Sequence, residues 1–87
     1  MEDIRAPDCF YIEEKLQQIM DIPIFHDDQH GTAIACLAGL INACHLTKRE
    51  IKDVRVVVNG AGAAGIGTLK LITAYGFKGE NCTLCDS

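Results

Sequence analysis

The chain has 87 residues, of which 48% are hydrophobic and 6% aromatic, and its formal net charge is -4. A chain of this length makes at most one small domain with a modest core. The acidic balance, without a basic stripe, argues against nucleic acid or an anionic membrane surface as a partner. The apolar run at residues 33–41 is too short to cross a bilayer and predicts a buried helix.

The N-terminal third of the chain predicts a helix followed by a short strand. Apolar residues recur at helical spacing over residues 9–19, and Asp8 is expected to be the N-cap of this helix. Pro23 disfavours helical geometry in the residue before it. Residues 22–25 are therefore predicted to form a short strand that leads into a polar run.

The middle of the chain predicts a buried helix and a polar connector. Thr32 is expected to cap a helix over residues 33–46, which are apolar almost all the way round. Residues 47–53 are polar and are expected to connect this helix to the next element.

The last third predicts a strand–helix–strand unit. Residues 55–58 are rich in valine and are expected to form a parallel strand that is buried on both faces. A helix is predicted over residues 63–75, where Gly76 ends it, and a second strand over residues 81–86. This order predicts an α/β fold.

The five cysteines do not suggest disulfides. Their number is odd, they lack regular spacing, and no secretory leader precedes them, so the reducing cytoplasm is the expected compartment. Cys36 and Cys44 are expected to act as small hydrophobic residues in the buried helix. Cys82 and Cys85 have a C-x-x-C spacing, but residues three apart on a strand face opposite sides, so we interpret them as structural thiols.

A glycine loop, Gly60-x-Gly62-x-x-Gly65, lies between the predicted strand and the predicted helix, as a dinucleotide-binding fingerprint requires. Its glycines allow the tight turn, the approach of a pyrophosphate and close helix packing, while the helix N-terminus offers free N–H groups. Asp86 follows about 20 residues later, where a carboxylate binds ribose hydroxyls and repels a 2′-phosphate. The alternative is a glycine-rich turn that binds nothing. The predicted cofactor-binding residues are Gly60, Ala61, Gly62, Ala63, Ala64, Gly65 and Asp86.

A second candidate site is the polar run at residues 26–30, His-Asp-Asp-Gln-His, between two apolar segments. Carboxylates at such a junction are costly to desolvate unless a cation or hydrogen-bond donors compensate them. Oxygen ligands favour Mg²⁺ or Mn²⁺. Asp27 and Asp28 are expected to point in different directions, so that only one of them is a direct ligand. Glu2 and Asp3, taken alone, read as an exposed acidic pair.

Zinc is the rival interpretation of the same run. His26 and His30 are four residues apart, but Gly31 and the extended lead-in argue against a helical turn there, and the H-E-x-x-H pattern is absent. We therefore interpret both histidines as hydrogen-bonded junction residues.

Four motifs together resemble the central segment of bacterial malic enzymes, in order and with the spacing of that family. They are Glu2-Asp3-Ile4, Pro7-x-Cys9-Phe10, the run from Phe25 to Ala33, and the run from Val58 to Gly65. The resemblance implies that residues 1–26 end a malate- and metal-binding catalytic domain. It also implies that residues 27–87 begin a Rossmann-type NAD(P)-binding domain with its first βαβ unit.

The resemblance further implies oxidative decarboxylation of L-malate to pyruvate with NAD or NADP as cofactor and Mg²⁺ or Mn²⁺ as the cation. It assigns Glu2, Asp3 and Asp28 as metal ligands and links Asp27, in a supporting catalytic role, to the surroundings of the catalytic lysine. The acid tyrosine and base lysine of the family match no residue of this chain. We therefore expect an inactive fragment of a cytoplasmic, homo-oligomeric parent enzyme. The alternatives are a stand-alone or remnant dinucleotide-binding module, and another Rossmann oxidoreductase that shares only the glycine loop.

Overall fold

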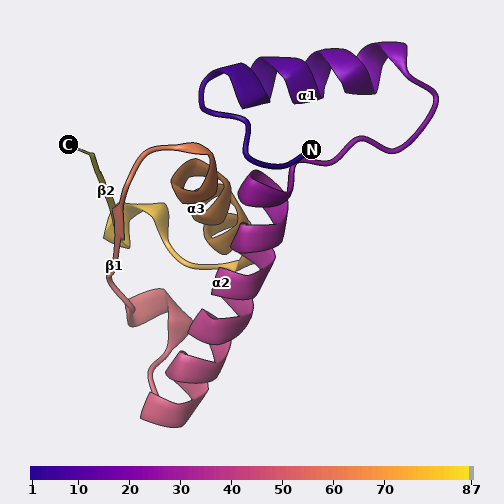
Figure 1. Ribbon diagram of the computed structural model, residues 1–87. Helices are drawn as coiled ribbons and strands as arrows, with labels where there is room; N and C mark the ends of the chain where they lie inside the picture. The colour runs from indigo at the N-terminus through magenta and orange to yellow at the C-terminus, as the bar shows by residue number, and fades with distance from the viewer. Residues whose placement is uncertain (87) are drawn as a thin grey trace.

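The computed structural model describes residues 1–86, and Figure 1 shows the arrangement of their helices and strands. The elements, in chain order, are α1 (Asp8–Ile19), α2 (Asp27–Thr47), the short 3-10 helix η1 (Ile51–Asp53), β1 (Val56–Asn59), α3 (Ala63–Tyr75), the 3-10 helix η2 (Gly79–Asn81) and β2 (Cys82–Cys85). The prediction of an α/β fold is confirmed.

The C-terminal half is one βαβ unit. Strands β1 and β2 pair in parallel, with Val56 opposite Cys82 and Asn59 opposite Cys85. The connection between them is α3, which lies between the strands and α2 (Figure 1). Parallel strands require such a crossover, because a tight turn would reverse the chain direction. The predicted bounds of α3 are confirmed, and both strands lie within two residues of their predicted positions.

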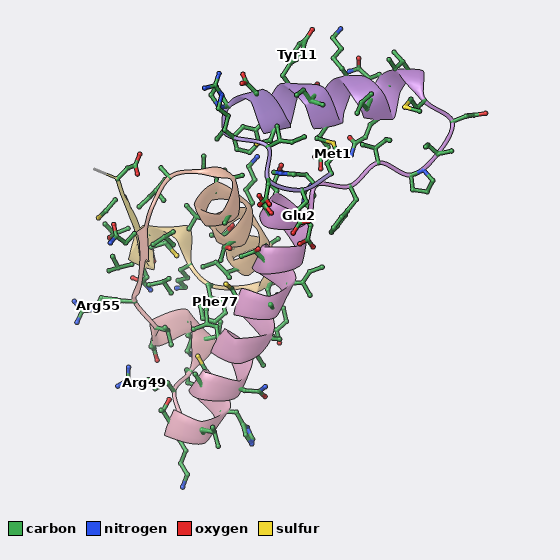
Figure 2. All side chains as sticks on the ribbon, in the orientation of Figure 1. Met1, Glu2, Tyr11, Arg49, Arg55 and Phe77 are labelled. Carbon is green, nitrogen blue, oxygen red and sulfur yellow. The ribbon has the colours of Figure 1, made fainter. Side chains whose placement is uncertain are left out.

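The core lies between α2, α3 and the segment after α3, far from the N-terminus. Its buried residues are Cys44, Ile72 and Phe77. Phe77 points inward between α2 and η1 in Figure 2, and it follows directly after Gly76, whose φ of 141° lets the chain turn back at the end of α3. Cys44 therefore acts as a small hydrophobic residue, as predicted.

The start of α2 differs from the prediction. The helix begins at Asp27 with His26 as its N-cap residue, so Thr32 lies inside the helix and caps nothing. Two carboxylates in the first turn complement the positive end of the helix dipole, which outweighs the low helix propensity of Gly31. The prediction that residues 26–30 do not form a helical turn is therefore wrong.

The region around α1 also differs in part. Asp8 is the first residue of α1 rather than its N-cap, which is Pro7, and its Oδ2 accepts a hydrogen bond from Arg5 Nε at 3.0 Å. The predicted strand at residues 22–25 is irregular chain. Within residues 1–86 this segment has no neighbouring strand with which to form a ladder, and its one backbone bond to the N-terminal segment is the bond from Met1 N to Phe25 O.

The predicted burial is only partly realised within residues 1–86. The sheet is covered by α3 on one side, so Val57 on the other side keeps 69% of its surface exposed. Cys36 is likewise exposed, and it lines an open cleft between α2, β1 and α3. Among the described residues, no helix has the length and apolar character that crossing a membrane requires.

Candidate metal and dinucleotide site

The N-terminal segment is held against the start of α2 by three hydrogen bonds. Met1 N donates to Phe25 O at 2.8 Å, and Asp27 N donates to Met1 O at 2.9 Å. Asp3 N then donates to Asp28 Oδ2 at 3.0 Å. Asp3 itself has left-handed backbone geometry, with φ of 55°. These bonds therefore join two segments that are about 25 residues apart in the sequence.

Between these bonds, Glu2 lies beside the first turn of α2 (Figure 2). One carboxylate oxygen each of Glu2, Asp27 and Asp28 lies within 4.8 Å of the other two. We call these three residues the acidic cluster. Asp27 and Asp28 lie in the first turn of α2, at the positive end of the helix dipole. Three converging oxygen donors fit a hard divalent cation such as Mg²⁺ or Mn²⁺.

The acidic cluster differs from the predicted ligand set in its members. The structure brings Glu2 and Asp28 together as expected, but it adds Asp27 and contributes Asp3 through its backbone N–H. The two neighbouring aspartates lie on a helical turn, where adjacent side chains are about 100° apart around the axis instead of on opposite sides as in extended chain, and one oxygen of each reaches the cluster.

Gly31 makes room for the acidic cluster. A Cβ atom at this position would collide with Asp27 Oδ1, four residues earlier on α2. Because residue 31 is a glycine, the Asp27 carboxylate can lie against the next turn of the helix. Glycine is needed at position 31 because of the space that the Asp27 side-chain oxygen occupies. It is not needed for an unusual backbone conformation, since Gly31 has ordinary helical geometry.

Glu13, on α1, connects that helix to the start of α2, a role that the sequence analysis missed. Its buried carboxylate accepts hydrogen bonds from His26 N at 2.9 Å and from His30 Nε2 at 2.9 Å. Its position in the sequence could have indicated that Glu13 is buried, because it lies four residues after Cys9 and three before Leu16, on the inner face of α1. His30 is a hydrogen-bonded junction residue, as predicted, whereas His26 is bonded only through its backbone.

The glycine loop joins β1 to α3 as the fingerprint predicts. Gly60 has φ of 123°, which disfavours any other residue there, and its N–H donates to Cys85 O at 2.6 Å. A Cβ atom on Gly65 would collide with Gly60 O, so the loop and the helix approach each other as closely as backbone allows. Gly62 is the N-cap residue of α3, and the space where its Cβ would lie is open.

The N-terminus of α3 presents free donors. The N–H groups of its first turn, on Ala63, Ala64 and Gly65, have no helical acceptor. With the positive end of the helix dipole they form a cradle for an anion such as a pyrophosphate. Asp86 lies at the end of β2, where its Oδ1 accepts a long hydrogen bond of 3.4 Å from Ala61 N.

Asp28 of the acidic cluster and the glycine loop line one cleft of about 510 Å³, whereas Glu2 and Asp27 are not among its lining residues. Asp28 and Thr32 line it from α2, and Gly60 lines it from the loop. The helices hold the two sides together, because Gly67 on α3 lies so close to Gln29 on α2 that a Cβ there would collide with the Gln29 backbone. The further lining residues are Asp3, Ile4, Arg5, Ala6, Asn59, Gly62, Ala63, Ala64 and Gly65.

A parallel βαβ unit with this glycine loop defines a Rossmann-type dinucleotide-binding segment. Residues 29–83 match the sequence model of the family described as malic enzyme, NAD binding domain. The chain therefore belongs to the malic enzyme family, as the motif resemblance predicted.

Known relatives agree with this assignment. The chain is 60% identical over all 87 residues to the NADP-dependent malic enzyme of Rhizobium meliloti, of which it covers 11%. The solved NAD-dependent malic enzyme of Thermotoga maritima is 48% identical, with a TM-score of 0.92, over 99% of this chain and 22% of that one. The Entamoeba histolytica malic enzyme is 43% identical, with a TM-score of 0.96, over 99% of this chain and 18% of that one. The chain thus spans between 11% and 22% of the length of these three relatives.

Proposed function

We propose that this chain supplies part of the cation site and the pyrophosphate cradle of an enzyme that oxidises and decarboxylates L-malate to pyruvate with NAD or NADP. The observation that carries the proposal is the single cleft that Asp28, a member of the acidic cluster, lines together with the glycine loop. Hydride transfer to a nicotinamide requires substrate and dinucleotide to lie side by side, and a shared cleft meets this requirement.

Glu2 and Asp28 are the proposed ligands that lie together in the acidic cluster. Asp3 remains a ligand proposed from the family resemblance, and its N–H holds the Asp28 carboxylate. Asp27 keeps the supporting role proposed for it and is a further candidate ligand through its place in the cluster. A bound Mg²⁺ or Mn²⁺ would polarise the oxygen atoms of the substrate and stabilise the negative charge that develops on them.

The glycine loop is the proposed site of the dinucleotide pyrophosphate. The first-turn N–H groups of α3 would donate to the phosphate oxygens, and Gly62 would leave space for their approach. Asp86 is proposed to accept from the ribose hydroxyls. Its hydrogen bond to Ala61 N is long, at 3.4 Å, so exchanging it for a ribose hydroxyl costs little.

We also propose the domain division at residue 26. It is supported by the start of the matched NAD binding domain at residue 29 and by the position of α1 apart from the other helices (Figure 1). A cytoplasmic location is supported by the five free cysteines, and a homo-oligomeric parent by the family resemblance alone.

A second candidate is a dinucleotide-binding module without catalysis. It is favoured by one observation, that no tyrosine or lysine of residues 1–86 lines the cleft that Asp28 and the glycine loop share. Under this candidate the acidic cluster has no role in a reaction, and only the glycine loop binds a ligand.

The substitution Asp28→Asn separates the two candidates. In the full-length polypeptide that carries these residues, we expect malate-dependent reduction of NAD or NADP to be lost. The affinity for Mn²⁺ should fall more than about ten-fold, because a charged oxygen is removed from the site. Dinucleotide binding, followed by fluorescence, should persist, since the glycine loop is unchanged.

The matched control is Asp21→Asn, which neutralises an exposed carboxylate in the irregular chain between α1 and α2. It should leave both Mn²⁺ affinity and turnover unchanged. Normal Mn²⁺ affinity in the Asp28 variant would exclude the proposed cation site.

A further inference from the structure

His26 is the one histidine whose side chain is completely buried, and its ring lacks hydrogen bonds within residues 1–86. Its exposed fraction is 0%, and neither Nδ1 nor Nε2 has a partner. Buried polar groups are nearly always hydrogen-bonded, and an orphaned group at a functional site calls for an explanation. The imidazole is therefore the strongest unexplained polar feature of the chain.

The ring is held beside the acidic cluster by the chain on both sides of it. The N–H of His26 donates to the buried carboxylate of Glu13 at 2.9 Å, and its carbonyl accepts from His30 N at 3.0 Å. With the backbone fixed in this way, Nε2 lies 3.8 Å from Asp28 Oδ2. A displacement of roughly 1 Å would bring these two atoms to hydrogen-bond distance.

We propose that His26 is a positioning residue that donates a hydrogen bond from Nε2 to the Asp28 carboxylate and so orients it toward a divalent cation. This inference rests on the proposed cation site. A neutral ring that carries its proton on Nε2 suffices for the bond. Two donors, this ring and Asp3 N, would then bind the same oxygen of Asp28.

His26 is not itself placed as a ligand. The group of side chains whose donor atoms converge contains Glu2, Asp27 and Asp28, and it does not include His26. A hard cation also prefers oxygen to imidazole nitrogen. The orientation of a ligating carboxylate depends on the groups that donate hydrogen bonds to it. Losing such a group typically weakens metal binding ten- to hundred-fold.

The test compares Mn²⁺ binding by variants of the full-length polypeptide, with free Mn²⁺ measured by electron paramagnetic resonance. His26→Leu removes both ring nitrogens, and we expect the Mn²⁺ dissociation constant to rise about ten-fold. His26→Gln retains a donor near the Nε2 position and should stay within about three-fold of the unsubstituted protein. His45→Leu changes an exposed histidine in the last turn of α2 and should have no effect.

Melting without metal distinguishes positioning from a structural role. Replacing an unpartnered buried ring by an apolar side chain should leave the melting temperature of the metal-free His26→Leu protein unchanged or raised. Weaker Mn²⁺ binding in a protein that is not less stable is the result expected for a positioning residue. A loss of affinity that only follows a lower melting temperature, without rescue by glutamine, would overturn the inference.

The two proposals fail in different ways. Unaltered Mn²⁺ binding by His26→Leu, with binding lost in Asp28→Asn, would overturn the role of His26 alone. Normal binding in Asp28→Asn would overturn the cation site. If His26→Leu does not fold, ¹⁵N spectra of the unsubstituted protein with Mg²⁺ decide the question, because an Nε2 without a proton contradicts the proposed donor.

Discussion

The glycine loop and the acidic cluster are built in different ways. The glycine loop uses only backbone, from one contiguous stretch between β1 and α3, and its essential contacts are Gly60 O against Gly65 and Gly60 N with Cys85 O. The acidic cluster uses side chains from two segments about 25 residues apart, joined by bonds such as Asp3 N to Asp28 Oδ2. Dinucleotide binding at the glycine loop should therefore be sensitive to added atoms. Cation binding at the acidic cluster should be sensitive to the loss of charges and hydrogen-bond donors.

The largest effect is expected from Gly65→Ala, which breaks the backbone side of this comparison. The new methyl group would collide with Gly60 O, and a backbone atom cannot move aside as a flexible side chain can. We expect a loss of about 1–3 kcal/mol in the free energy of unfolding, measured by urea denaturation, together with loss of dinucleotide binding.

Gly62→Ala is the matched variant in the same loop. Its methyl group meets open space, so stability should be unchanged while dinucleotide affinity falls, because the methyl group occupies the side of the cleft from which phosphate approaches. Equal destabilisation by both alanines would contradict the close packing of Gly65 against Gly60.

A smaller effect is expected from Gly31→Ala, which sharpens the side-chain half of the comparison. The added methyl group displaces the Asp27 carboxylate from the acidic cluster, while alanine favours the helix. Mn²⁺ affinity, measured by calorimetry, should therefore fall up to about ten-fold without a loss of stability.

Gly39→Ala on the same helix provides the control. No atom outside the adjoining backbone of its own helix lies within 4 Å of its added Cβ, so it should raise the free energy of unfolding by about 0.5–1 kcal/mol and leave Mn²⁺ affinity unchanged. If Gly31→Ala and Gly39→Ala bind Mn²⁺ equally well, Gly31 does not position Asp27.

The same contrast explains what the sequence could predict. Local signals define α3, because the glycine loop precedes it and Gly76 follows it, and its predicted bounds agree with the structure. Elements with few local signals were less predictable. The start of α2 at Asp27 depends on charge–dipole attraction and on bonds from the N-terminal segment, which outweigh the local effects of Pro23 and Gly31.

Tertiary contacts account for the remaining differences. The sequence around Glu13 does not indicate its hydrogen-bond partners, because His26 and His30 are 13 and 17 residues away. The two aspartates were expected to point in different directions because residues 27 and 28 were predicted to lie outside a helix, whereas in the first turn of α2 one oxygen of each lies close to the other. Val57 was expected to be buried, but residues 1–86 provide no element that covers its side of the sheet.

The location of a bound cation tests the central claim most directly. Crystals of the full-length polypeptide grown with Mn²⁺ and NAD or NADP would give an anomalous difference peak for manganese. We expect this peak between the carboxylates of Glu2 and Asp28, with the pyrophosphate at the first turn of α3. A manganese peak away from both carboxylates, or a dinucleotide bound elsewhere than the glycine loop, would contradict the shared cleft.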